Sequence, residues 1–543
     1  MTAPPAASIE DPVPVSVSRA GWVIGLGLFA AILLAGPPEG LSPAGHRLAA
    51  VTALMGVFWV TQALPMEVTS LIPLVLFPLC GVQSAKSVAG AYFSDSSFLY
   101  LGGFLLALGI ERWGLHRRLA LHIVAMTGLG VRRIVLGFML ATFAISMWIS
   151  NTAAALLMLP IALALLTALE HPEGDDGEPA VPRPRDPDFA PFGMATMLGL
   201  GYAATLGGMA TLVGTPTNVV YVEVFQKQFP DGPPLSAAEW MLTWTPCALA
   251  FLVVTWVLLT FRLRTPSRLA SLDKTFFTQR VRELGPMRTG EWWMSGIFLL
   301  TALLWLSRTG LDAGEAFQLP GWNTFGDRWL TWLGVEKPRD FINDSTVAMG
   351  MALIMFVIPL RAEPKGPFVP LMDWHTASRL PWGILLLFGG GFAIAEACRT
   401  TGLAEWSGVW LATSVRGMPT WLIIAVICLL VTFLSEFTSN VATANALLPI
   451  VAGLAVALEL DPRLLMLPAT LAASCGFMLP IGTPPNAIVF GTGRIRITQM
   501  AGYGFLLDII GVALIVAATF TLLVPQLQID TQRIPAWAKA KTP

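Results

Sequence analysis

The feature that most constrains this fold is a polar motif that occurs twice inside strongly apolar sequence. The first copy, at 146–161, reads SMWISNTAAALLMLPI, and the second, at 435–450, reads SEFTSNVATANALLPI, 289 residues later with no gap. A second pair of motifs lies 268 residues apart, GTPTN at 214–218 and GTPPN at 482–486. Lipid tolerates interrupted helices only where they face protein or water. Paired interruptions in two halves of a chain therefore indicate the binding site of a membrane transporter.

The composition also indicates a membrane protein. Of the 543 residues, 55% are hydrophobic and only 12% are charged, whereas soluble domains carry about 25% charged residues. The five cysteines form no CxxC pair, which favours buried, inert thiols. The net charge of −1 says nothing about partners, and we expect no nucleic-acid partner. We predict an all-α, polytopic membrane protein.

About eleven apolar segments are long enough to span a bilayer. They are 20–36, 48–64, 68–84, 96–111, 192–223, 238–261, 292–308, 344–361, 382–397, 464–490 and 503–525. Two further apolar stretches, 134–169 and 418–457, are interrupted at their centres by the Ser-Asn motif. We favour a re-entrant hairpin for each, because hairpins give both halves the same layout. A full span with a break in mid-membrane is the alternative.

The distribution of Lys and Arg predicts the orientation. Basic residues cluster after the fourth, sixth and tenth spans, and all three clusters lie on one side if the N-terminus is cytoplasmic. The loop 310–341 and the C-terminus then lie outside. The Pro-rich, polar start is not that of a cleavable signal peptide. We expect an integral, multi-pass protein of a bacterial inner (plasma) membrane.

An internal repeat extends beyond the polar motifs. Gly-Gly-Phe at 102–104 and at 390–392 is followed by Gly-Leu at the same spacing, with an offset of 288 residues. An odd number of membrane passes separates equivalent elements, and an odd number inverts the second copy. The sequence therefore predicts two inverted repeats.

The motif residues are uncharged donors and acceptors suited to a small anion and a cation. Broken helices free backbone amides and present positive helix ends. The side chains that can donate to a carboxylate are Ser150, Asn151, Thr152, Ser439 and Asn440. Oxygen ligands for a hard cation are available from the same asparagines and from Ser146, Gly214, Ser435 and Gly482. Neither tip carries Lys or Arg, so a bound anion requires helix ends and co-bound cations to offset its charge.

This pattern resembles the divalent anion/sodium symporter family, which includes the sodium-coupled dicarboxylate and citrate transporters. The resemblance covers nearly the whole chain, including QALP at 62–65 and VTSLIPL at 68–74. It implies two sodium sites, one formed by Ser146, Ser150, Asn151 and Gly214, and one formed by Ser435, Thr438, Asn440 and Gly482. It also implies that substrate carboxylates bind at Ser150, Asn151, Thr152, Ser439, Asn440 and Val441, with Thr483 and Pro484 nearby.

The resemblance further implies how the molecule is divided and how it moves. Family members are homodimers that work as elevators, in which a transport domain moves past a fixed scaffold. The implied scaffold comprises 20–130 and 292–417, and the implied transport domain comprises 131–265 and 418–526. A cytoplasmic tail (1–19), a cytoplasmic linker (266–291) and an external tail (527–543) complete the division. The implied activity is sodium-coupled uptake of succinate, malate, fumarate or citrate, with Na⁺ as the co-transported ion.

Two residues of the second hairpin leave questions open. Val441 stands where the family usually has threonine, so the second tip lacks a hydroxyl donor, and Thr443 is two residues further on. Glu436 is an ionisable residue inside the membrane and is functional by default. It takes part in proton coupling, or it is a structural acid that is hydrogen-bonded inside the transport domain.

Two other functions compete with sodium-coupled carboxylate uptake. Within transport, the same scaffold can serve sulfate uptake or sodium-independent dicarboxylate exchange. In another class, the chain would be a membrane-embedded hydrolase. The sequence contains no HExxH or GxSxG pattern and no paired intramembrane aspartates, which disfavours the hydrolase.

Overall fold

The computed structural model describes residues 15–128, 130–170, 188–266, 276–308, 310–312, 318–336, 338, 341–361 and 368–539, and it is mostly helical. The first part contains α1 (Val15–Ala35), α2 (Pro43–Thr61), α3 (Met66–Thr69), α4 (Ile72–Leu79), α5 (Ala85–Ala91), α6 (Asp95–Arg112), α7 (Leu115–Thr127), α8 (Val131–Ser146), α9 (Asn151–Glu170), α10 (Phe189–Met209), α11 (Pro216–Gln228) and α12 (Ala237–Thr260).

The second part continues with α13 (Phe276–Glu283), α14 (Thr289–Leu306), α15 (Asn323–Trp332), α16 (Asp344–Val357), α17 (Trp374–Ala377), α18 (Trp382–Thr401), α19 (Leu403–Val415), α20 (Thr420–Phe437), α21 (Asn440–Ala457), α22 (Arg463–Ser474), α23 (Pro484–Phe490), α24 (Ile497–Ala518), the π-helix η4 (Thr519–Leu523), α25 (Val524–Gln526) and the 3₁₀ helix η5 (Ala536–Ala538). Two small antiparallel ribbons were not predicted. They pair β1 (Gly310–Asp312) with β2 (Gln318–Pro320), and β3 (Pro359–Arg361) with β4 (Phe368–Pro370).

Nine helices among the described residues are long and apolar enough to cross a membrane. They cover the spans predicted at 20–36, 238–261, 382–397 and 503–525, and they include both arms of the second interrupted stretch. Three further apolar helices are shorter, at Met66–Leu79, Asp344–Val357 and Arg463–Ser474. Length and composition therefore support a multi-pass helical membrane protein.

The predicted spans that contain the GTPxN motifs are each divided into two helices. The segment 192–223 forms α10 and α11 with an unwound segment at 210–215, and 464–490 forms α22 and α23 with an unwound segment at 475–483. In both cases the second helix begins at a proline, Pro216 or Pro484. Proline has no N–H to donate to the preceding turn but fits the first turn of a new helix. The GTPxN motifs therefore end one helix and start the next.

Matching elements occur in the same order in the two parts of the chain. The order α6–α7, α8–α9, α10–α11, α12 corresponds to α18–α19, α20–α21, α22–α23, α24. The first junction of each series is a left-handed glycine, Gly114 with φ 74° and Gly402 with φ 76°. Glycine adopts this conformation without the steric cost that a Cβ atom brings. The Gly-Leu pairs of the sequence repeat mark these two sharp turns.

The helices α8 and α9 form the two antiparallel arms of one hairpin that packs on α10. The contacts that set their directions are Gly199 with Met139, Gly207 with Phe143, Gly208 with Asn151, and Gly193 with Leu166. Residue numbers that rise along α8 contact residue numbers that rise along α10, so these two helices are parallel. Residue numbers that rise along α9 contact residue numbers that fall along α10, so α9 is antiparallel to α10. The two arms of the stretch 134–169 therefore run in opposite directions along α10.

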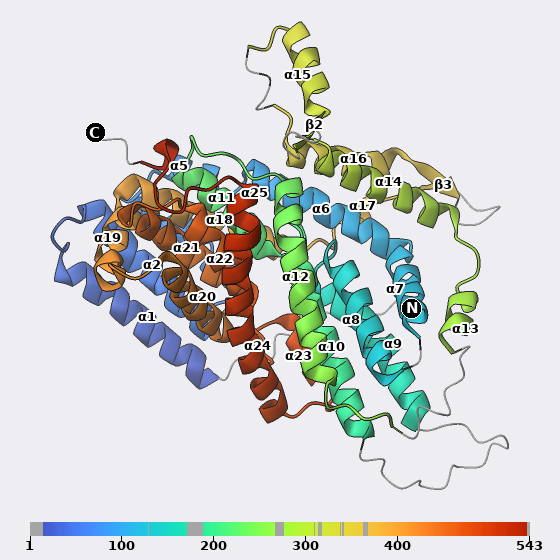
Figure 1. The fold of residues 1–543 in the computed structure, drawn as a ribbon. Coiled ribbons are helices and arrows are strands. Elements are labelled where there is room, and N and C mark those ends of the chain that lie inside the picture. Colours follow the sequence, from blue (N-terminus) through green and yellow to red (C-terminus); the bar gives the residue numbers. More distant parts are fainter. Residues whose placement is uncertain are drawn as a thin grey trace.

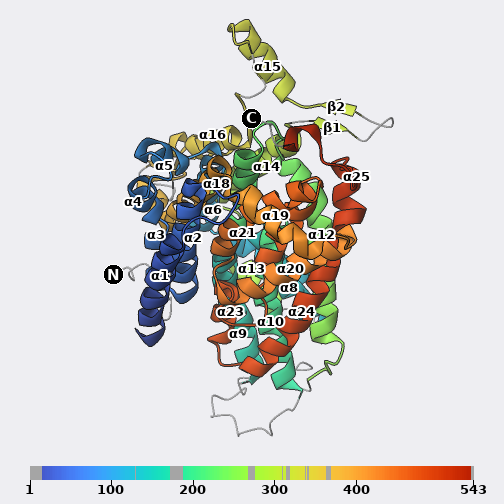
Figure 2. The same cartoon turned by 90° about the vertical axis from the view of Figure 1, so that its left-hand side faces the viewer.

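The long helices stand side by side, as Figure 1 and Figure 2 show from two directions. The helix α12 packs against both α10 and α24. In both views α15 and α25 lie at the upper end of the molecule, whereas the ends of α9 and α10 that flank 171–187 lie at the lower end. The connections of the chain are thus divided between two opposite ends.

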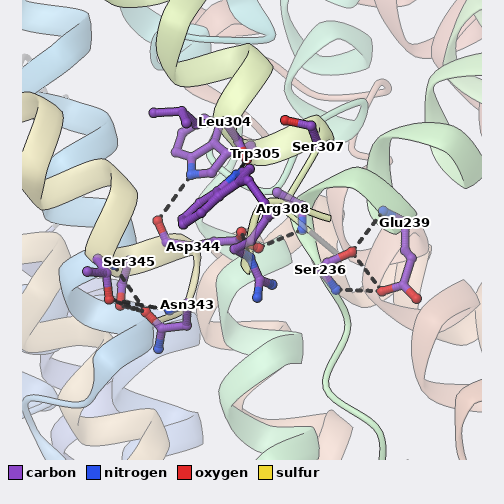
Figure 3. A network of polar contacts seen from close by, with 12 residues as sticks. Ser236, Glu239, Leu304, Trp305, Ser307, Arg308, Asn343, Asp344 and Ser345 are labelled. Atoms are coloured by element: carbon purple, nitrogen blue, oxygen red, sulfur yellow. Dashed lines mark hydrogen bonds and ion pairs between the residues drawn. The ribbon is translucent and has the colours of Figure 1, made fainter. Parts of the chain in front are cut away.

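A buried polar network joins the start of α12 to α14 and α16 (Figure 3). The Asp344 carboxylate accepts a hydrogen bond from the Ala237 amide at 2.8 Å and one from Arg308 Nε at 2.5 Å. Trp305 Nε1 donates to the Asp344 carbonyl oxygen at 3.1 Å. Because the carboxylate meets both a guanidinium and a helix N-terminus, its burial is compensated.

Candidate functional site

The first Ser-Asn-Thr motif lies at the turn between α8 and α9. The Ser146 hydroxyl, at the end of α8, lies 2.6 Å from the Ala204 carbonyl oxygen and 2.9 Å from Asn151 Oδ1. The Ser150 hydroxyl accepts a hydrogen bond from the Ala153 amide at 3.3 Å, which caps the start of α9. The turn therefore brings a hydroxyl, a carboxamide and a helix start together.

The second motif repeats this arrangement between α20 and α21. The Ser435 hydroxyl lies 2.5 Å from the Ala473 carbonyl oxygen and 2.8 Å from Asn440 Oδ1. Thr438 is the C-cap residue of α20, and its hydroxyl donates to the Leu434 carbonyl oxygen at 3.0 Å. Each tip thus places a serine hydroxyl between an asparagine oxygen and an alanine carbonyl on the neighbouring helix. Sequence reasoning missed both alanines, because a backbone carbonyl has no side-chain signature.

The glycines of the unwound segments have little room for a side chain. A methyl group on Gly214 would lie 2.6 Å from the Gly208 carbonyl oxygen, and one on Gly482 would lie 3.0 Å from Glu436 Oε2. Thr215 and Thr483 precede the new helices as their N-caps, and the Thr483 hydroxyl accepts from the Asn486 amide at 3.4 Å. Both segments therefore lie tightly against the residues around the tips.

The predicted site residues differ in their exposure. The tip residues that are half-buried are Ser150, Asn151, Thr152, Thr438, Ser439 and Asn440. The buried residues are Ser146, Gly214, Ser435, Val441, Gly482 and Thr483, whereas Pro484 is exposed. Val441 is only 7% exposed, and Thr443 is buried with its hydroxyl bonded to that of Thr438. Thr443 is therefore engaged inside the second tip.

The structure brings most of the two predicted cation sets together. In the first set, Asn151 and Gly214 both pack against Gly208. The Ser146 hydroxyl bonds Asn151. In the second set, Ser435 bonds Asn440, and Gly482 lies beside Glu436, the next residue to Ser435.

A hydrogen bond also joins the two halves. The Thr217 and Ser474 hydroxyls lie 2.7 Å apart, which links the start of α11 to the end of α22 beside Ala473.

Glu436 is the acid of the second hairpin, and it is 1% exposed. Its carboxylate accepts hydrogen bonds from the Met478 amide at 2.7 Å and the Leu479 amide at 3.0 Å, both in the unwound segment. These bonds favour the structural interpretation of Glu436. Sequence reasoning missed its neighbour Asp508, which is fully buried in α24 with its carboxyl beside that of Glu436. The available signal was a lone acid in the apolar stretch 497–518.

Comparison with known families and proteins gives one consistent result. Residues 17–524 match the family model described as the sodium:sulfate symporter transmembrane region. One relative is the sodium-dependent dicarboxylate transporter SdcS of Staphylococcus saprophyticus, 38% identical over 517 residues, which are 95% of this chain and 93% of the relative. Another is SdcS of Staphylococcus aureus, 38% identical over 512 residues, 94% of this chain and 92% of the relative.

Two solved structures have a similar fold. MtrF of Neisseria gonorrhoeae, described among antimetabolite efflux pumps, has a TM-score of 0.52 and 14% identity, covering 95% of this chain and 97% of its own. The YdaH transporter of Alcanivorax borkumensis has a TM-score of 0.53 and 14% identity, covering 93% and 98%. At this level of identity the likeness concerns the fold alone.

Proposed function

This chain belongs to the sodium:sulfate symporter family, and we propose that it is a secondary active transporter that takes up small di- or tricarboxylates together with sodium. The observation that carries the proposal is the duplicated tip, in which a serine hydroxyl, an asparagine carboxamide and a backbone carbonyl converge twice. The names of relatives with 38% identity over most of the chain support the substrate class and the ion.

The chemistry of the tips explains why the two solutes would be coupled. A dicarboxylate loses most of its hydration on entering a buried site, which is costly unless its charge is balanced. The tip residues 150–152 and 439–440 supply neutral donors only. Sodium ions bound beside the carboxylates supply the balancing charge, so each solute raises the affinity for the other by the same factor.

The proposed ligand sets follow the two tips. The first sodium ion binds Ser146, Ser150, Asn151 and Gly214, and the second binds Ser435, Thr438, Asn440 and Gly482. The substrate lies between the tips, against Ser150, Asn151, Thr152, Ser439, Asn440 and Val441, with Thr483 and Pro484 at its edge. The contacts that bring Ser146, Asn151 and Gly214 around Gly208 support the first set.

We further propose that the protein is a homodimer with eleven spans, two re-entrant hairpins and two inverted repeats. Segments 131–265 and 418–526 form a transport domain that moves as an elevator past the scaffold segments 20–130 and 292–417. The tails 1–19 and 527–543 and the linker 266–291 lie outside both. This topology has a cytoplasmic N-terminus and an external C-terminus, and it requires α15 and α25 to lie at the end of the molecule opposite to the α9 and α10 ends that flank 171–187, as they do in Figure 1.

The alternatives differ in how well they are supported. Sulfate is named in the family description, so sulfate uptake remains the second candidate. Sodium-independent exchange lacks such support, since the named relatives are sodium-dependent. The protein is a transporter and not a membrane hydrolase, because it belongs to a symporter family and its named relatives are transporters.

The test is uptake of labelled succinate into proteoliposomes, with and without an inward sodium gradient. We expect uptake that requires sodium and is competed by unlabelled succinate, citrate or 2-oxoglutarate but not by sulfate. Absence of succinate uptake together with sodium-dependent uptake of labelled sulfate would favour the sulfate symporter. Uptake that needs internal dicarboxylate and ignores sodium would favour the exchanger.

A further inference from the structure

We infer that Asn218 and Asn486, the last residues of the two GTPxN motifs, are positioning residues that hold the unwound segments in the shape that each cation site requires. Neither residue belongs to the ligand sets proposed above. The inference rests on the proposed sodium coupling, and it adds to that proposal the side chains that fix the geometry of the two sites.

In the first half, the Asn218 carboxamide bridges two carbonyls at the end of α10. Its Nδ2 donates to the Gly208 carbonyl oxygen at 3.1 Å and to the Thr211 carbonyl oxygen at 2.7 Å. The Thr211 hydroxyl in turn donates to the Met147 carbonyl oxygen in the first tip and accepts from the Gly214 amide at 3.0 Å. Asn218 is fully buried, so this connection is shielded from solvent.

In the second half, Asn486 makes the equivalent bonds 268 residues later. Its Nδ2 donates to the Gly476 carbonyl oxygen at 2.9 Å and to the Leu479 carbonyl oxygen at 3.1 Å. The Leu479 amide donates to Glu436 beside the second tip at 3.0 Å. Asn486 is also fully buried. The same pair of bonds from one asparagine Nδ2, which we call the clamp, therefore occurs in both halves. The bonds that join each unwound segment to its tip differ between the halves.

The backbone that each asparagine holds lies next to residues of the proposed sodium sites, which are Asn151 and Gly214 in the first half and Gly482 in the second. A methyl group on Gly208 would lie 2.3 Å from Asn151 Oδ1, and one on Gly214 would lie 2.6 Å from the Gly208 carbonyl oxygen. In the second half, a methyl group on Gly482 would lie 3.3 Å from the Leu479 carbonyl oxygen and 3.5 Å from that of Gly476. A shift of either clamped turn therefore changes the spacing between proposed ligands.

Asparagine is well suited to this position. The accepting carbonyls lie at the end of α10 or in the unwound segment after α22, where a continuous helix no longer supplies their partners. One Nδ2 group offers two N–H donors without a charge. Serine has one donor, aspartate when ionised has none, and lysine would bring a buried charge. Neither Oδ1 atom accepts a hydrogen bond within the described part of the chain. The donated bonds are therefore the polar contacts that a substitution of these side chains removes.

The test replaces each asparagine with leucine, which has a similar volume and no donor. We expect Asn218→Leu and Asn486→Leu to raise the sodium concentration for half-maximal uptake about tenfold, with the maximal rate at saturating sodium within about twofold of wild type. Stabilisation of the purified protein against heat by sodium should need the same higher concentration. A purely structural role would lower the melting temperature without changing this sodium dependence.

Asn445→Leu is the matched control. Asn445 is equally buried, its Nδ2 donates to the Leu387 carbonyl oxygen at 3.3 Å, and its Oδ1 likewise lacks a partner among the described residues. It bonds neither unwound segment, so we expect lower stability and unchanged sodium dependence. If the leucine variants are not recovered folded, Asn218→Ser and Asn486→Ser, which retain one donor, carry the same test.

The outcomes separate this inference from the proposed function. Folded variants with the sodium dependence of the wild type would overturn the inference and leave sodium coupling intact. A shift in the Asn445 control equal to that at Asn218 and Asn486 would also overturn it, because the effect would then follow from any buried asparagine. A wild-type protein without sodium dependence would overturn the proposed function, and this inference with it.

Discussion

At the scale of single residues, each tip contains a serine whose hydroxyl has a backbone acceptor as well as an asparagine acceptor. The Ser146 hydroxyl has two acceptors within reach, Ala204 and Asn151, and Ser435 has the equivalent pair, Ala473 and Asn440. A serine that loses its asparagine partner still has a carbonyl to bond. The asparagines can therefore contribute to ligand binding without being essential to the fold.

The first prediction concerns these asparagines. Asn151→Ala and Asn440→Ala should each abolish coupled uptake at ordinary sodium concentrations and leave the protein folded. The loss of one hydrogen bond to a charged group costs about 1.5–3 kcal/mol, or about ten- to a hundredfold in affinity. Labelled-succinate uptake and the melting temperature are the measurements. Sodium-dependent uptake at the wild-type level in either variant would contradict the proposed sites.

The second prediction concerns Val441, where the second tip departs from the first. Threonine is close to valine in size, so Val441→Thr should fit the buried position and add one donor. We expect the apparent affinity for succinate to rise about two- to tenfold with unchanged sodium dependence, and Thr152→Val to weaken it by a similar factor. Competition curves measure both. Unchanged affinity with a lower melting temperature in Val441→Thr would show that residue 441 faces the protein and not the substrate.

At the scale of elements, the two hairpins are joined to their unwound segments by different chemistry. In the first half a neutral hydroxyl, that of Thr211, bonds the Met147 carbonyl of the tip. In the second half the Glu436 carboxylate of the hairpin accepts two amides of the unwound segment. In the first half the unwound segment therefore donates a hydroxyl hydrogen bond to the hairpin, whereas in the second half it donates two amide hydrogen bonds to a carboxylate of the hairpin.

The third prediction tests this joint. In Glu436→Gln the amide nitrogen cannot accept a hydrogen bond, so one of the amides of Met478 and Leu479 loses its partner. We expect a loss of about 1–3 kcal/mol in stability, seen as a lower melting temperature. Glu396→Gln is the control, because Glu396 forms an ion pair with the partly exposed Arg399, and such pairs contribute about 0–1 kcal/mol. Equal melting temperatures for the two variants would argue against a structural role for Glu436.

At the scale of the whole molecule, the proposed topology makes both outer ends of each hairpin face the same side of the membrane. The first hairpin begins near 133 and ends at 170, and Ala190 follows it at the start of α10, while the ends of the second hairpin lie near 418 and 459. A full span with a break would instead put the two ends of a stretch on opposite sides. Residues 133, 190, 418 and 459 are exposed in the structure.

The fourth prediction uses this difference. Single cysteines introduced as Met418→Cys and Glu459→Cys, in a background without the native thiols, should both react with an impermeant maleimide added to intact cells. Arg133→Cys and Ala190→Cys should react only after the membrane is opened, because the first hairpin enters from the cytoplasm. Labelling of residues 418 and 459 from opposite sides would show that the second stretch is a full span and not a hairpin.

The positions at which the apolar helices are interrupted follow from the amino-acid sequence alone. The interruptions at 150, 214, 439 and 482 arise from local rules, since Pro, Gly and the capping Ser, Thr and Asn act on their own turn of the chain. The pairing of the motifs also predicted the two tips and the residues near them.

The contacts of those residues, in contrast, depend on how the helices pack. Ser146 meets the Ala204 carbonyl 58 residues away, and Glu436 meets amides in the next interrupted helix and the carboxyl of Asp508. Backbone carbonyls and amides are the same at nearly every position, so the residue type does not predict which of them bonds a given side chain. Which of them reaches a side chain depends on how the helices pack, and packing is set by the whole chain at once.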